Sequence, residues 1–165
     1  MSKSLFLVRH AKSDWSDPGQ KDFDRELNSR GVIDAPKMGR KLFDMGVKPD
    51  IILCSPALRA KLTCEYVTEQ LKFDEDKIVY DEEIYEASTR SLLNVINNID
   101  DKYQSAMLFG HNPTFTYIAE NFTKESLGNI PTCGVVQIDF ELDSWKEVSG
   151  ETGKLKFFIY PKMFW

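Results

Sequence analysis

The apolar residues of this chain gather in short runs that turns and amphipathic segments separate. Residues 4–8 (SLFLV), 51–54 (IILC) and 106–109 (AMLF) are such runs, each four or five residues long. Runs of this kind, bounded by polar residues, predict strands that are buried on both faces, as in the centre of a parallel sheet. We therefore expect a sheet built around these three strands.

A helical pattern follows each of the last two runs. Ser55-Pro56 offers an N-cap with proline at the first helical position, and apolar residues then recur at helical spacing as far as Leu71. Asn112-Pro113 predicts the same kind of start for a helix that ends near residue 122.

Two more helices are expected elsewhere in the chain. Residues 29–45 predict a helix with Gly46 as its stop, in which Pro36 must introduce a kink or a break. Residues 88–97 place their leucines and isoleucine on one face, which predicts a further helix.

The pattern changes to strands near the end of the chain. Residues 135–142 alternate between apolar and polar, residues 154–160 form another strand, and residues 143–152 make a hairpin-like excursion between them. Alternating strands and helices followed by extra strands predict an α/β fold: a three-layer α/β/α sandwich with a mainly parallel central sheet and an antiparallel edge strand. Without a linker-like stretch, residues 1–165 are expected to form one domain.

Charge and composition limit the kinds of partner and the cellular location that we expect for this protein. The chain has 26 acidic and 21 basic residues, a net charge of −5, which argues against nucleic acid as a partner. No apolar run approaches the roughly 18 residues of a membrane span, and the apolar stretch that ends at Val8 is too short for a secretory signal, so we expect a cytoplasmic protein without a membrane partner. Cys54, Cys64 and Cys133 lack metal-type spacing and are expected to be reduced and buried.

The two histidines of the chain are the strongest chemical signal. His10 and His111 each follow a predicted buried strand almost directly. The carboxyl ends of parallel strands lie at one edge of a sheet, so both imidazoles should meet there. Arg9 precedes His10, and Arg59 lies early in a helix that starts at the same edge. Two arginines, two histidines and nearby helix N-termini predict a pocket for a small dianion.

A metal site is the main chemical alternative. His10 and His111 could bind zinc or iron together with carboxylates such as Asp14, Asp17 or Asp24. The two neighbouring arginines argue against it, because fixed positive charges disfavour a bound cation.

Several motifs together resemble the histidine phosphatase superfamily, also called phosphoglycerate-mutase-like. They are LVRHAKS at residues 7–13, SPALRA at residues 55–60 and GHNP at residues 110–113, with the later Pro131-Thr132 and Tyr160-Pro161-Lys162. In this order and in so short a chain they are most similar to the SixA-type phosphohistidine phosphatases.

The resemblance implies a role for each residue of the cluster. His10 would be the nucleophile that forms a phosphohistidine intermediate, which water then hydrolyses. It must be neutral to attack, so its other ring nitrogen should donate to a backbone carbonyl or a carboxylate. Arg9, Arg59 and His111 would bind the non-bridging oxygens of the phosphoryl group. The resemblance implies neither a metal ion nor a cofactor.

The chain departs from the wider family at two positions. Ser16 stands where many relatives have an asparagine, and its side chain has less reach, but we keep it as a candidate ligand of the substrate phosphate. The general acid of the family's esterases and mutases is a glutamate, for which Glu86 is our first candidate and Glu83 the alternative, and a solvated acid without a catalytic role is also open. A departing imidazole, with a conjugate-acid pKa of about 6.5, needs less help from an acid than an alkoxide does.

Only 51 residues separate Arg59 from His111 (111 − 59 − 1), which leaves no room for a cap domain over the pocket. An open pocket can admit a side chain of another protein. We therefore expect a phosphatase acting on phosphohistidine in a protein substrate, and a monomer. The alternatives are a phosphatase for small phosphoesters on the same fold and a phosphate-binding module without turnover.

Overall fold

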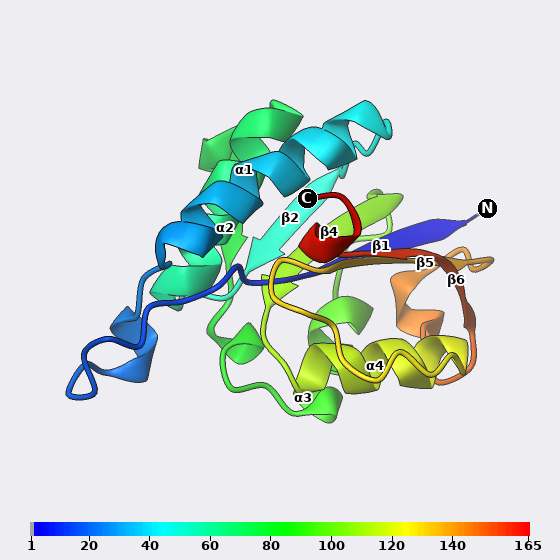
Figure 1. The fold of residues 1–165 in the computed structure, drawn as a ribbon. Helices are drawn as coiled ribbons and strands as arrows, with labels where there is room; N and C mark the ends of the chain where they lie inside the picture. The colour runs from blue at the N-terminus through cyan, green and yellow to red at the C-terminus, as the bar shows by residue number, and fades with distance from the viewer. Residues whose placement is uncertain (1) are drawn as a thin grey trace.

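A six-stranded sheet runs through the middle of the protein, with its strands in the order β3-β2-β4-β1-β5-β6 (Figure 1). The computed structural model describes residues 2–165. The first four strands of that order are parallel, whereas β5 runs antiparallel to β1 and β6 antiparallel to β5. The strands are β1 (Lys3–Arg9), β2 (Ile51–Cys54), β3 (Val79–Tyr80), β4 (Ser105–Gly110), β5 (Val135–Phe140) and β6 (Gly153–Ile159). The expected mixed sheet is confirmed.

Four helices cover the two faces of this sheet, as Figure 1 shows. Leu5 and Leu7 of β1 point to one face and pack in a core with α3 and α4, while Phe6 and Val8 point to the other and pack with α1 and α2. The alternation follows from the two-residue period of a strand, and it confirms the three-layer α/β/α sandwich. The helices are α1 (Ser29–Asp44), α2 (Leu58–Leu71), α3 (Thr89–Asn97) and α4 (Thr114–Thr123).

Helix α1 runs without interruption through Pro36, so a break at this proline was a wrong expectation. Ala35 and Met38, on either side of the proline, are fully buried in the core beneath α1. Burial on both sides holds the helix together although proline removes one hydrogen bond, at a cost of about 3 kcal/mol. The expected end is confirmed, because Gly46 follows the C-cap residue Met45 and has a positive φ of 82°.

The expected N-cap of α2 is also wrong. The helix begins at Leu58, and its N-cap residue Ala57 makes no side-chain cap bond. Ser55 accepts a hydrogen bond from the Ala57 N–H at 3.2 Å, and its Oγ lies 2.8 Å from Nε2 of His111. Tertiary contact with a histidine from another strand end therefore decides the position of this serine.

The start of α4 differs from its prediction in a similar way. Pro113 is the N-cap residue and not the first helical residue, and its peptide bond to Asn112 is cis. Oδ1 of Asn112 accepts hydrogen bonds from the backbone N–H and the hydroxyl of Thr116. The asparagine thus still satisfies an amide of the first helical turn.

The segment between Arg59 and His111 contains most of α2, then β3, α3, β4 and short turns, with no inserted cap domain. The three cysteines are free and buried, as expected. In residues 2–165, none of the helices is both long and apolar enough to cross a membrane.

The C-terminal residues pack onto α1, as Figure 1 shows. Nε1 of Trp165 donates to Oδ1 of Asp34 at 3.2 Å, and Nζ of Lys37 lies 5.5 Å from the centre of the indole. This end is therefore packed against the helix through Trp165, although Met163 and Phe164 remain exposed.

We expect Gly31→Ala to lower the free energy of unfolding by about 3 kcal/mol, because overpacking of this kind costs about that much. A Cβ at this position of α1 would lie 2.3 Å from the backbone oxygen of Lys12. Because that oxygen belongs to the backbone, no change of side-chain rotamer can relieve the clash. Urea unfolding measures the effect. The control is Gly19→Ala, where the nearest atom to the new Cβ is 3.5 Å away, and equal stability of the two variants would contradict the prediction.

Candidate active site

The two histidines meet at the carboxyl ends of neighbouring strands. β1 and β4 pair in parallel with Arg9 opposite Gly110. His10 and His111 are the residues that directly follow these two strand ends. The backbone N–H of His10 donates to the oxygen of Gly110 at 3.0 Å, and the two imidazole centres are 5.3 Å apart. The sequence expectation that both rings share one edge of the sheet is confirmed.

His10 is held in the form that a nucleophile requires. Its Nδ1 lies 2.7 Å from the backbone oxygen of Ala11, an acceptor that requires a proton on Nδ1 and leaves Nε2 with its lone pair. Burial lowers the pKa of His10 to about 4 and outweighs the bond to Ala11, which raises it, while the charges of Arg59 and Arg9 lower the pKa further. The imidazole is therefore neutral at physiological pH, as the sequence analysis anticipated.

His111 presents the opposite nitrogen as a donor. The hydroxyl of Ser55 accepts from the Ala57 N–H, so its own proton is available to His111 Nε2, 2.8 Å away. In the tautomer in which Ser55 donates to Nε2, the ring proton lies on Nδ1, which is buried and has no hydrogen-bond partner in residues 2–165. Burial, followed by the neighbouring His10, lowers the pKa of His111 to about 3, so this ring is neutral as well.

One nitrogen of the Arg9 guanidinium makes a hydrogen bond, and another is buried without a partner. Its Nη1 donates to the backbone oxygen of Ile130 at 2.9 Å, while its Nε is buried without a protein partner. Burial and the nearby Arg59 lower the pKa of this guanidinium, which shows that the two cations lie close to each other. Two positive charges and two unpaired donors in one place favour an anion over a metal ion.

The guanidinium of Arg59 comes from the first turn of α2 and is buried. Its Nη1 donates to the backbone oxygen of Asp22 at 2.8 Å, and its Nη2 lies 3.0 Å from the Asp22 carboxylate. Tyr85 donates from its hydroxyl to the same carboxylate oxygen at 2.7 Å. Asp22 therefore orients an arginine that the sequence analysis placed in the site.

Asp22 and Tyr85 are residues that sequence reasoning missed. Burial alone would raise the pKa of Asp22, but the hydrogen bonds from Tyr85 and Arg59 outweigh it and hold the pKa below its usual value. The Tyr85 ring stands edge-on to His111 with 5.7 Å between ring centres. No motif marks either position, because the contacts join loops 63 residues apart in the chain.

The two candidate acids lie on different surfaces. Glu86 is exposed, has a positive φ of 55°, and lines an open hollow of about 340 Å³ whose wall includes His111 and Pro113. Glu83 lines a separate hollow near Ile51. Glu86 is thus the better placed of the two, but it makes no hydrogen bond to the histidine cluster in residues 2–165.

Ser16 lies in the exposed loop after β1. Its backbone N–H donates to the Asp14 carboxylate at 2.8 Å, and its hydroxyl also bonds this carboxylate. These bonds turn Ser16 toward its own loop and away from the unpartnered nitrogens of Arg9 and His111.

The acidic residues considered as metal ligands do not assemble around the histidines. Within residues 2–165, no group of three or more histidine, cysteine, aspartate or glutamate side chains is arranged to hold a metal ion. Asp14 binds Ser16, and the Asp17 carboxylate accepts from the Gly19 N–H. Asp14 and Asp17 thus bond to groups of their own loop.

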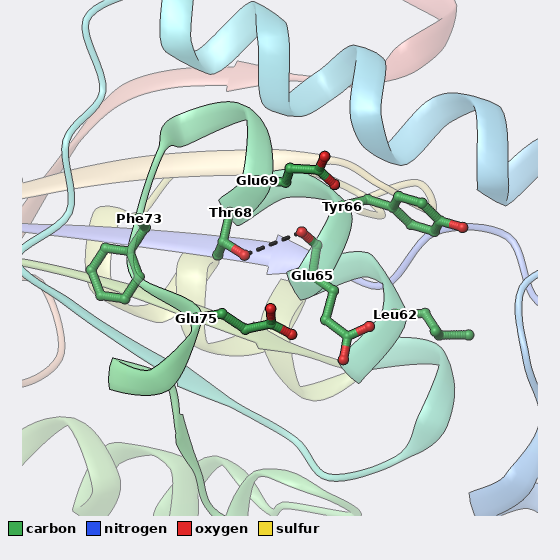
Figure 2. A pocket seen from close by; sticks show the side chains of 7 residues that line it. All are labelled: Leu62, Glu65, Tyr66, Thr68, Glu69, Phe73 and Glu75. Atoms are coloured by element: carbon green, nitrogen blue, oxygen red, sulfur yellow. Dashed lines mark hydrogen bonds between the residues drawn. The ribbon is translucent and has the colours of Figure 1, made fainter.

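A hollow of about 420 Å³ beside α2, shown in Figure 2, lies outside this cluster. It is lined by Leu62, Glu65, Tyr66, Thr68, Glu69, Phe73 and Glu75. Three carboxylates and no cation make it unsuitable for a phosphoryl group.

The free energy of unfolding is expected to fall as the pH is lowered from 7 to 5. In this range His10 and His111 take up protons only in the unfolded chain, where their pKa is about 6.5, because the fold holds these pKa values at about 4 and about 3. The unfolded state binds more protons, so stability rises with pH through this window. The two histidines together should account for roughly 4 kcal/mol, at about 1.4 kcal/mol per pH unit each below pH 6.5.

Urea unfolding at pH 7, 6 and 5 measures this decline. The control is the double variant His10→Gln/His111→Gln, which has no other histidine and should lose most of the pH dependence. Equal slopes for the wild type and the double variant would contradict the prediction.

Comparison with known proteins agrees with this geometry. The family model of the histidine phosphatase superfamily (branch 1) matches residues 5–127. An uncharacterised chloroplastic protein of Arabidopsis thaliana is 30% identical, over 98% of this chain and 79% of its own. A 2,3-bisphosphoglycerate-dependent phosphoglycerate mutase of Brucella anthropi is 33% identical, but the match covers 52% of this chain and 43% of the mutase.

Solved structures show the same fold. A candidate phosphohistidine phosphatase SixA from Agrobacterium tumefaciens has 32% identity and a TM-score of 0.81, with 96% of this chain and 98% of that chain covered. A protein histidine phosphatase SixA complexed with tungstate has a TM-score of 0.81 at 18% identity, covering 98% and 99%. A mycobacterial glucosyl-3-phosphoglycerate phosphatase has a TM-score of 0.70 at 14% identity, covering 94% and 98%. Since the family match spans well over half of the chain and includes the strands that carry both histidines, the chain belongs to the histidine phosphatase superfamily (branch 1).

Proposed function

We propose that this protein hydrolyses phosphohistidine on a protein substrate through a covalent intermediate on His10, without a metal ion. The observation that carries the proposal is the bond of His10 Nδ1 to the Ala11 oxygen, which leaves Nε2 as the nucleophilic nitrogen beside two arginines. Membership of the superfamily and the resemblance to SixA structures support a phosphatase.

The reaction follows from the donors at the site. Nε2 of His10 attacks phosphorus, the bond from phosphorus to the substrate's imidazole breaks, and that imidazole leaves with its electron pair and takes up a proton from solvent. A water molecule then attacks the phosphoryl group on His10, which releases inorganic phosphate, returns a proton to solvent and restores the neutral ring. Arg9, Arg59 and the Nδ1–H of His111 stabilise the charge on the non-bridging oxygens in both steps.

The weakly placed acid supports phosphohistidine over an alkyl phosphate. Glu86 is exposed and has no hydrogen bond to the cluster in residues 2–165. An imidazole leaving group has a conjugate-acid pKa of about 6.5, against about 15 for an alkoxide, so it departs with far less help from an acid.

The lack of a cap domain in residues 2–165 supports a macromolecular substrate. A phosphorylated side chain on a folded protein must reach the strand ends without being enclosed. The second candidate is a phosphatase for small phosphoesters, which is favoured by the shared fold of the mycobacterial glucosyl-3-phosphoglycerate phosphatase.

The test is phosphate release by the purified, metal-stripped protein in the presence of a chelator. A histidine-phosphorylated protein and phosphoserine are offered in parallel. Faster release from the phosphohistidine protein is expected, with Glu86→Gln changing that rate less than twofold. Release from phosphoserine alone, abolished by Glu86→Gln, would establish the small-ester phosphatase instead. Phosphate binding without turnover of either substrate would establish a binding module.

A further inference from the structure

A hollow of about 480 Å³ lies next to the candidate active site and is lined mainly by cationic and aromatic side chains. We call it the basic hollow. Its wall includes Lys12, Arg30, Asp34, Tyr160, Lys162 and Trp165. None of these residues has a part in the phosphoryl transfer described above.

The basic hollow opens at the same edge of the sheet as His10. Val8 of β1 pairs with Val135 of β5, which pairs with Ile159 of β6, so β6 is parallel to β1 and ends beside it. Two strand spacings of about 4.8 Å place Tyr160 about 10 Å from the end of β1. Lys12 is two residues from His10 in the chain, which joins the two sites along one loop.

The turn that separates the two sites is firmly held. The backbone N–H of Cys133 donates to the oxygens of Arg9 and His10 at 3.1 and 3.0 Å. Pro131 and Thr132, just before it, line the basic hollow. A ligand that fills the phosphate site and one that fills the basic hollow would therefore lie on the two sides of one rigid turn.

The charge of the basic hollow is opposite to that of the whole chain. Its lining has three cationic side chains and one carboxylate side chain, on a protein with a net charge of −5. Arg30 pairs with Asp34 at 2.8 Å, whereas Lys12 and Lys162 have no carboxylate within ion-pair distance in residues 2–165. The hollow of Figure 2 has three glutamates and no cation. Positive charge is thus concentrated beside the histidines.

The aromatic wall of the basic hollow is preformed. The Trp165 indole is fixed by its bond to Asp34 and by Lys37 over its ring, and Lys41 lies 4.4 Å from the ring centre of Phe164. A fixed aromatic surface with cations around it is typical of the centre and rim of a protein interface. Two of the lining residues are prolines, Pro131 and Pro161, which have no backbone N–H to donate to a compact phosphate group.

From this charge and wall we propose that the basic hollow binds an acidic segment of the phosphorylated protein substrate, next to the histidine that is dephosphorylated. The inference rests on the proposed function and adds a specificity site to it. Lys12 and Lys162 attract the carboxylates, while Tyr160 and Trp165 contact the apolar part of the segment. Recognition is electrostatic, so it weakens as the salt concentration rises.

The first test measures binding alone and does not depend on turnover. A fluorescein-labelled, unphosphorylated hexaglutamate peptide is titrated with wild type, Lys162→Glu and Lys48→Glu, and anisotropy is recorded at 50 and 300 mM salt. Lys48 is the matched control, an exposed lysine before β2 and hence at the opposite end of the sheet. We expect Lys162→Glu to raise Kd about tenfold at low salt and Lys48→Glu to leave it within twofold. Equal Kd values for all three proteins, or no binding by the wild type, would overturn the proposal.

The second test measures turnover of two phosphohistidine peptides, one flanked by glutamates and one by glutamines. Wild type should have a KM about tenfold lower for the acidic peptide, and Lys162→Glu should remove this preference while kcat stays within twofold. Cleavage of both peptides without a preference refutes the acidic docking site but keeps the phosphatase. Cleavage of neither, while phosphoserine is hydrolysed, refutes the proposed function, and the anisotropy result then decides the basic hollow independently. A Lys162→Glu effect confined to a small substrate with two phosphates would assign the basic hollow to that ligand instead.

Discussion

Replacing His10 by alanine is expected to reduce phosphate release about 10⁴-fold or more, because no other neutral imidazole beside the arginines is free to attack. His111 cannot substitute, since its Nε2 is bound to Ser55 and its Nδ1 is buried. The variant should still fold, because His10 makes one side-chain hydrogen bond, to the adjacent Ala11 oxygen. Phosphate release and the circular dichroism melting curve measure both expectations.

The covalent step gives this prediction a second readout. Wild type mixed with a ³²P-labelled substrate should acquire protein-bound label that survives alkali and is lost in acid, as a phosphorus–nitrogen bond requires. His10→Ala should acquire none, whereas the control His111→Ala keeps the nucleophile and should still be labelled, more slowly. Turnover by His10→Ala within tenfold of the wild type would disprove the assignment of the nucleophile.

Replacing Arg59 by alanine is expected to lower kcat/KM by about 10² to 10³-fold, the usual loss when one donor to a developing charge is removed. The guanidinium is buried and held by two bonds to Asp22, so it is already oriented before a phosphoryl group arrives. Arg59→Lys should recover only part of the loss, because an ammonium has no planar pair of donors.

Asp22→Asn tests whether Asp22 only orients Arg59 or takes part in the reaction itself. The substitution removes the ion pair but leaves the guanidinium in place, and Tyr85 can still donate to the amide oxygen. We expect a loss in kcat/KM of about tenfold, far smaller than that of Arg59→Ala. A loss as large as that of Arg59→Ala would show that Asp22 itself takes part in the reaction.

Local patterns anticipated the elements well. The strand at residues 51–54 has the expected bounds, and the helix expected at residues 88–97 begins one residue later, with Ser88 as its cap. Apolar runs and helical spacing are properties of neighbouring residues, which is why they can be seen in the sequence. The helix starts at Ser55 and Asn112 were misplaced, because both side chains satisfy partners outside the local pattern.

Local patterns predicted only part of the candidate site. Arg9, His10 and His111 lie at or directly after strand ends, so the parallel sheet brings them together once the strands are known. Arg59 needed only the start of α2. The contribution of Asp22 and Tyr85 was not predictable, since both come from irregular loops whose positions depend on packing against distant elements.

Periodicity and short motifs were enough to predict the layers of the fold, the family and the edge where the chemistry lies, because these features are encoded by neighbouring residues. The hydrogen-bond partners of the two imidazoles, the Ala11 oxygen and the Ser55 hydroxyl, became visible only in three dimensions. The basic hollow was likewise not predictable, because its Lys12, Arg30 and Lys162 come from three separate segments of the chain. Hydrogen bonds and charge clusters between distant segments depend on positions in space that no local pattern encodes.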